Sequence, residues 1–270
     1  HTAYQTALAS QKDAMTETEY NRLERLEREY LRKAVSWSND LGTIRFGHFK
    51  LHKLLGEHSW TLPEGDEEED KFSIMFDSCQ HMCLAEEPLQ VVEWLATLDR
   101  PNRQQTKFAH KCSPADADSL LTLSLLLLCA LENLRDASIL LKAYIDKVET
   151  RTMDELTTSY MKKDDGKAPA HVVFGAMLLR ICEKDPRTGP LFTWLLKSFK
   201  KEMDVMPKPN LIQGYTTKIG KVYFDIQPPP SMLSMMENMM GMMGGMGGGG
   251  APGGINPAMM QALAAAQGGM

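Results

Sequence analysis

The clearest helical signals of the chain lie between Ser113 and Val148, where the sequence is SPADADSLLTLSLLLLCALENLRDASILLKAYIDKV. Ser113 suits the N-cap of a helix, and Pro114 suits the first helical position, where an N–H has no partner to lose. Asp116 adds the negative charge that the helix dipole favours at this end. The leucines that follow are apolar nearly all round the helix, so we expect the helix to be covered on both sides.

A second helix follows this leucine-rich one after a short connection. The first helix is predicted to end at about Leu131, and Glu132–Leu134 reads as a tight turn into a helix over Asp136–Val148. Two helices with so short a connector pack antiparallel. Such pairs are the unit of α-solenoids, in which each pair buries its open face on the next.

The sequence on both sides of this helix pair is dominated by the same helical periodicity, and strand alternation is nearly absent. Further helices are predicted over Phe49–His58, Phe72–Glu86, Pro88–Leu98, Ala170–Glu183, Pro190–Val205 and Asn210–Phe224. No repeat of fixed length can be counted. The sequence therefore predicts an all-α, TPR-like α-solenoid of roughly eight helices on the strength of its antiparallel helix pairs.

The first clear helix begins at Thr16, with Glu19 three residues later as a capping-box signal, and ends at Asn39–Gly42. Its apolar residues recur at steps of three, four or seven. These residues, which we expect to form one buried face, are Tyr20, Leu23, Tyr30, Ala34 and Trp37.

Two polar segments interrupt the helices. Pro63–Asp70 carries six acidic residues in eight positions and reads as a solvated loop, although such a run could also steer a basic partner. Glu149–Pro169 is rich in threonine and charge, and we expect a loop there with some extended structure.

Charge and cysteine content exclude several classes of protein. With 30 basic and 35 acidic residues and a net charge of −5, no basic stripe is available for nucleic acid. The five cysteines are odd in number and favour a reducing compartment. The first 30 residues are polar, without a secretory signal, and the apolar run Leu120–Leu131 is shorter than the about 20 residues that cross a bilayer. We therefore expect a cytosolic protein without a membrane span.

Metal sites and catalytic motifs are weakly represented. Two groups could hold a metal: Cys79, His81, Cys83, His110 and Cys112; and His48, His52 and His58. In a helix His81 would point away from Cys79 and Cys83, and His48 and His52 lack the acidic partner that hydrolysis requires, so ordinary structural roles are favoured. No nucleophile elbow, Walker motif or dinucleotide glycine pattern occurs. We expect neither an enzyme nor a bound cofactor or metal.

The C-terminal tail differs in composition from the rest. After Pro228–Pro230, residues 231–270 hold 11 of the 19 methionines and 11 of the 20 glycines, with Glu237 the one charged residue. This composition predicts a disordered tail. Several methionines would line one side of a short helix: Met232, Met235, Met236, Met239, Met240 and Met243. An alternative function is therefore a chaperone-like binder of hydrophobic segments that acts through the tail.

Specific blocks resemble the fourth Golgi-to-ER traffic protein family. They are Arg32-Lys-Ala-Val-Ser-Trp-Ser-Asn, Phe46-Gly-His-Phe-Lys-Leu-His-Lys-Leu-Leu, the helix pair within Leu123–Tyr144, Pro190-Leu-Phe-Thr-Trp-Leu-Leu, and Tyr215-Thr-Thr-Lys-Ile-Gly-Lys-Val-Tyr-Phe-Asp-Ile-Gln-Pro-Pro. The resemblance covers about residues 28–60 and 114–235. Residues 61–112 follow the family pattern poorly, and most of the family's N-terminal helical half has no counterpart before about Glu27.

The resemblance implies a non-catalytic cytosolic adaptor in the targeting of tail-anchored membrane proteins to the ER. Family members bridge a targeting ATPase to a ubiquitin-like partner subunit. It implies three parts here: an incomplete N-terminal helical segment over 1–112, a C-terminal α-solenoid half over 113–227 that holds the ubiquitin-like subunit, and the tail over 228–270. Binding to the ATPase is expected to be weak. The partner-binding residues that we predict, from large apolar side chains in the closing blocks, are Phe192, Trp194, Leu195, Ile219 and Phe224.

Overall fold

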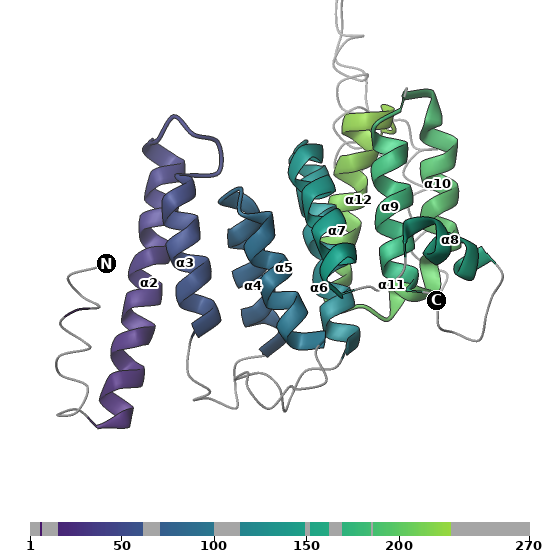
Figure 1. The fold of residues 1–270 in the computed structure, drawn as a ribbon. Helices are drawn as coiled ribbons and strands as arrows, with labels where there is room; N and C mark the ends of the chain where they lie inside the picture. Colours follow the sequence, from purple (N-terminus) through teal and green to yellow (C-terminus); the bar gives the residue numbers. More distant parts are fainter. Residues whose placement is uncertain are drawn as a thin grey trace, which may run out of the picture. The chain divides into compact units, whose positions relative to one another are not determined.

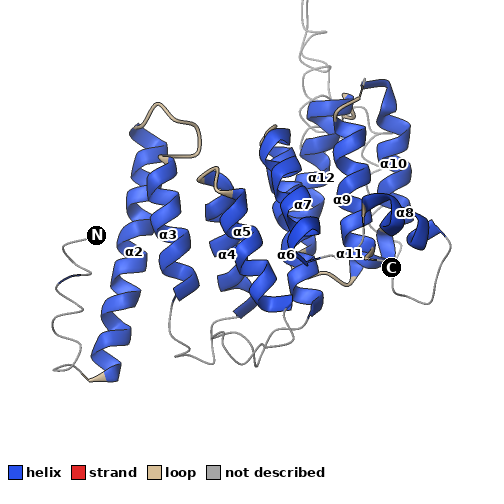
Figure 2. Cartoon of the chain, in the orientation of Figure 1, coloured by secondary structure: helices blue, strands red, loops and turns tan. Residues whose placement is uncertain are grey.

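The computed structural model describes Thr6 and residues 16–61, 71–99, 114–148, 152–161, 169–184 and 186–227. Every regular element in these ranges is a helix (Figure 2), which confirms the all-α prediction. The described residues all belong to one compact unit, which ends at Gln227. The acidic run at 63–70 and the methionine-rich tail lie outside the described residues, so their conformations stay predictions.

Most of the described helices pack on the helix that follows them in the chain (Figure 1). They are α2 (Glu17–Leu41), α3 (Phe49–Thr61), α4 (Lys71–Leu84), α5 (Pro88–Asp99), α6 (Pro114–Ala130), α7 (Leu134–Val148), α8 (Met153–Met161), α9 (Ala170–Cys182), the 3₁₀ turn η3 (Pro186–Thr188), α10 (Gly189–Ser198), α11 (Lys200–Asp204) and α12 (Pro209–Phe224). Helix α2 packs on α3, α3 on α4, α5 on α7, and α9 on both α7 and α10. Stacked helix pairs confirm the predicted α-solenoid.

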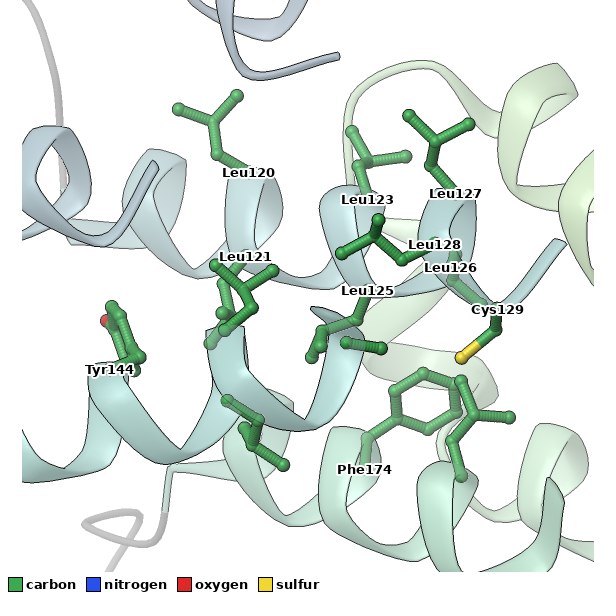
Figure 3. Close-up of a cluster of buried hydrophobic side chains, with 14 of the residues drawn as sticks. Leu120, Leu121, Leu123, Leu125, Leu126, Leu127, Leu128, Cys129, Tyr144 and Phe174 are labelled. Carbon is green, nitrogen blue, oxygen red and sulfur yellow. The ribbon is translucent and has the colours of Figure 1, made fainter. Parts of the chain in front are cut away.

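Helix α6 lies at the centre of this stack, as its leucine-rich sequence predicts. It packs against α4, α5, α7, α9 and α12, and every residue from Ser119 to Ala130 is buried. Figure 3 shows the leucines of α6 pointing in several directions around the helix axis. Helices that precede α6 in the chain and helices that follow it all bury apolar surface against it. Helix α6 therefore connects the N-terminal and C-terminal parts of the core.

The turn between α6 and α7 forms as the sequence indicates. Glu132 takes a left-handed backbone conformation, with φ 66°, that reverses the chain after α6. The Asn133 side chain then caps α7, because its Oδ1 accepts a hydrogen bond from the Asp136 N–H at 3.1 Å. The Asn133 amide also donates to the Asp136 carboxylate at 2.7 Å. These bonds place the start of α7 at Leu134, two residues before the predicted start.

Two predictions about the C-terminal half were wrong in detail. Met153–Met161 forms helix α8 where a loop was expected, because Thr152 and Glu155 make a reciprocal capping box. The predicted single helix over Pro190–Val205 is broken at Phe199, whose φ of −101° and ψ of 16° end α10 before α11 begins. Phe199 is buried, with 1% of its surface exposed, so burial of its ring accompanies the break.

The prediction for α2 was correct at its start and wrong about its faces. The Thr16–Glu19 capping box forms. The face towards α3, however, carries Leu31 and Val35, which pack with Leu55 of α3. Tyr30 and Trp37, expected inside, are 68% and 65% exposed. Two apolar stripes run along this helix, and α3 covers the stripe that contains Leu31.

Gly175 allows α9 to approach α6 closely. A Cβ atom at this position would lie 2.6 Å from Cδ1 of Leu125, a side chain that is fully buried. We expect Gly175→Val to lower the free energy of unfolding by about 1–3 kcal/mol through overpacking. Gly214→Val on α12 is the control for the loss of glycine, because no atom lies within 4 Å of its added Cβ. Equal losses in urea denaturation of the two variants would contradict this explanation.

Candidate partner-binding surface

The predicted partner-binding residues divide into a buried group and one exposed residue. Phe192, Leu195, Ile219 and Phe224 are at most 7% exposed and belong to the main core. The structure brings Phe192 and Phe224 together, with stacked rings whose centroids lie 4.8 Å apart. These side chains fix α10 against α12, and a partner would not reach them without opening that contact.

Trp194 is the predicted residue that reaches the surface. It is 55% exposed on α10, and Leu191, one helical turn before it, is 53% exposed. Lys197 follows after another turn and is exposed as well. Because Phe192 and Leu195 anchor the buried side of α10, Leu191 and Trp194 are held on a fixed scaffold. We call this pair with Lys197 the α10 surface.

A groove between α7, α8 and α9 is a second candidate surface, with a volume of about 700 Å³. Leu141, Ile145, Met153, Ala176 and Leu179 supply its apolar lining. Its exposed charged residues are Lys142, Asp146, Arg180 and Glu183, two of each sign. An apolar floor with mixed charges at its edge fits a protein segment that offers apolar side chains and charges of both signs.

Sequence reasoning did not identify the groove residues or Leu191. The groove depends on Met153 of α8, which was placed in a loop, although the Thr152-x-x-Glu155 capping box was a usable signal. Leu191 lies three positions before Trp194, and that spacing marks a shared helix face. The sequence did not show which face of α10 is buried, since both faces carry large apolar residues.

The described cysteines and histidines of the two candidate metal groups make structural contacts. Burial raises the pKa of the Cys83 thiol to about 12 and raises that of Cys79 as well, so both stay protonated. The imidazole of His58 lies 3.0 Å from the Glu24 carbonyl oxygen, whereas His52 contacts the Phe46 carbonyl. Within the described ranges, no three metal-ligating side chains converge. His110 and Cys112 lie outside those ranges.

Buried His52 and partly buried His81 form a pair between α3 and α4. The Nε2–H of His52 donates to the Phe46 carbonyl at 2.7 Å, which leaves its Nδ1 to accept from the Nδ1–H of His81 at 2.8 Å. Burial, with smaller contributions from the neighbouring His52 and Arg32, lowers the pKa of His81 to about 4 against the opposing effect of Asp77. Burial also lowers the pKa of His52. The pair is therefore neutral at pH 7 and links two helices.

Stacked helix pairs with an open groove between them are typical of helical-repeat proteins. The sequence model of one such family, Golgi to ER traffic protein 4, matches residues 6–246. The chain belongs to this family. The match extends beyond the blocks on which the resemblance was recognised, and it includes residues 61–112 and residues before Glu27.

Two relatives illustrate the similarity. Protein GET4 of Arabidopsis thaliana is 24% identical over 199 residues, which cover 73% of this chain and 51% of the relative. The chain thus spans about half the length of that relative. The crystal structure of C. therm. Get4 matches with a TM-score of 0.48 and 19% identity, covering 85% of this chain and 66% of the other. Among the described helices, none is both long and apolar enough to span a membrane.

Proposed function

We propose that this chain is a cytosolic, non-enzymatic adaptor in the targeting of tail-anchored membrane proteins to the ER. Its C-terminal helices α7–α12 hold a ubiquitin-like partner subunit. Membership of the Golgi to ER traffic protein 4 family supports the pathway. The observation that carries the partner site is the exposure of Leu191 and Trp194 on a helix whose other side is locked by Phe192 and Phe224.

Exposed large apolar residues on a rigid helix are suited to anchoring a protein partner. Burying Trp194 and Leu191 costs little backbone ordering, because α10 is already fixed by its buried face. The nearby Lys197 favours a partner that is acidic at the edge of the contact. The groove between α7 and α9 offers a second apolar contact in the same half of the chain.

Trp194→Ala and Leu191→Ala should each weaken binding of the ubiquitin-like subunit, and Trp194→Ala should do so by about thirtyfold, the size expected of a hot-spot residue. Calorimetry with the whole chain measures this. The melting temperature should stay the same, because both side chains are more than half exposed. The control is Leu89→Ala, which removes a 57% exposed apolar side chain from α5, outside the α10 surface.

A groove-filling variant, Ala176→Trp, tests the second surface in the same titration. Ala176 is partly buried and lines the groove, so a tryptophan there would occupy the space between α7 and α9. Weakened binding in Ala176→Trp would extend the partner site to the groove. Full affinity in both Trp194→Ala and Ala176→Trp would contradict the proposed site.

A further inference from the structure

Four large apolar residues form a stripe along the face of α2 that α3 leaves open. Leu26, Tyr30, Trp37 and Leu41 are 49%, 68%, 65% and 71% exposed. At 3.6 residues per turn they fall within about 60° around the helix axis. Helix α2 stands at one end of the row of helices in Figure 1, and its other side belongs to the small core with α3. Such a stripe indicates an interaction surface.

The spacing of the stripe is the same from either end. Its members are separated by four, seven and four residues, so the stripe reads alike in both directions along the helix. An isologous contact between two copies of a protein requires this property, because a twofold axis sets one patch against itself. In an antiparallel pair of α2 helices, Leu26 faces Leu41 of the second copy and Tyr30 faces Trp37. Aliphatic side chains then meet aliphatic ones, and rings meet rings.

The residues at the midpoint of the stripe suit a close approach of two helices. The midpoint falls between Lys33 and Ala34, and Ala34 is small and partly buried. A small residue there leaves space for the rings of Tyr30 and Trp37 from both copies to pack across the axis, at the about 8–10 Å between axes that is usual for helix pairs. The long side chain of Lys33 extends its ammonium group away from the contact.

The charged edge of the stripe favours a second copy over a partner of one charge sign. Arg22, Glu29, Lys33 and Asp40 are exposed and lie along one edge of the stripe, two basic and two acidic. A surface built for a strongly acidic or strongly basic partner carries the opposite sign. Because this edge has no net charge, two identical edges approach each other without overall repulsion.

We propose that α2 is a self-association surface, on which two copies of this chain pair antiparallel through the stripe. A whole aromatic side chain buries about 150–250 Å², so two largely exposed rings and two leucines supply roughly 500 Å² in each copy. The pair then buries roughly 1,000 Å², which is at the lower limit for a specific interface. The dimer is therefore weak, with a dissociation constant on the order of 10 µM.

Sedimentation velocity with the full chain tests the surface, over protein concentrations from about 1 to 200 µM. Tyr30→Ser and Trp37→Ser should each raise the dissociation constant of the dimer at least tenfold, as expected of central aromatic anchors. The matched control is Leu89→Ser on α5, which removes a 57% exposed apolar side chain outside the stripe and should leave the dissociation constant unchanged. Circular dichroism checks that each variant keeps its helical content.

Disulfide trapping tests the antiparallel register. When Leu26→Cys chains are mixed with Leu41→Cys chains and oxidised with glutathione disulfide, the two should link to each other, as identified by mass spectrometry of the joined peptides. Each variant alone should form linked dimers at least tenfold more slowly, because residues 26 and 41 lie about 22 Å apart along one helix. Cys112→Ser in both chains removes a competing thiol, and the four described native cysteines are buried.

Three results would overturn the proposal. A chain that stays monomeric up to about 200 µM would assign the stripe to another segment of this chain or to a different protein. A dimer that Tyr30→Ser and Trp37→Ser leave unchanged would form through another surface. Faster linking of Leu26→Cys chains to one another than to Leu41→Cys chains would show a parallel pair, which the spacing argument excludes.

Discussion

Replacing Phe174 by alanine should lower the free energy of unfolding by about 3–5 kcal/mol, the range for removing a fully buried phenylalanine. The ring is 2% exposed on α9 and meets the edge of the Phe199 ring at a centroid distance of 5.5 Å. Figure 3 shows it directed towards α6. Because α6, α9 and the α10–α11 junction meet at this ring, its loss would leave a cavity that no single helix can close.

Urea denaturation followed by circular dichroism measures this loss. Trp194→Ala is the matched control, since it removes a larger side chain from α10 that is 55% exposed, and it should change stability by less than about 0.5 kcal/mol. The midpoint for Phe174→Ala should fall while the slope of the transition stays the same. A loss below about 1 kcal/mol would show that the site collapses around the missing ring.

Acid should destabilise the fold through His81. Burial holds its pKa at about 4, below the usual 6.5, so between these values the unfolded chain binds more protons than the folded chain. The stability that the neutral imidazole contributes is complete above pH 6.5 and is lost as the pH falls towards 4. The groups that face it are His52 on α3, Asp77 on its own helix and Arg32 on α2.

His81→Gln separates this contribution from that of other titrating groups. Glutamine cannot take up the proton, so the free energy of unfolding of this variant should fall less steeply between pH 6.5 and 4, by up to about 1.4 kcal/mol per pH unit. Denaturation curves at intervals across this range provide the comparison. If the wild-type and His81→Gln curves run parallel over the whole range, protonation of the pair does not control acid stability.

The sequence predicted the centre of the fold better than its edges. In α6 nearly every residue is apolar, so no choice of face was needed, and the structure buries them all from Ser119 to Ala130. In α2, by contrast, either of two apolar stripes could have been the buried face. Spacing alone predicted that Tyr30 and Trp37 are buried, whereas in the structure α3 covers Leu31 and Val35. A local pattern can show that a face is apolar, but contact with a neighbour decides which one is covered.

The same reason limits what could be predicted about the partner-binding surface. Phe192, Trp194 and Leu195 are all large and apolar within four residues of α10, and only the position of α12 determines that Phe192 stacks inside while Trp194 faces outwards. Helix α8 was missed for a different reason. It has nine residues and a mixed composition, and its capping box was a stronger signal than its periodicity.

The position of α12 has a consequence for synthesis on the ribosome. This helix packs on α6, where the Tyr223 hydroxyl donates to the Cys129 carbonyl 94 residues earlier, and Lys208 contacts Ser73 of α4. At 5–20 residues per second, translation of that interval takes about 5–19 s, during which one side of the leucine-rich helix α6 has no cover. A nascent chain arrested before Pro209 would keep that side open, so premature stop codons in this region should yield products that aggregate or bind chaperones.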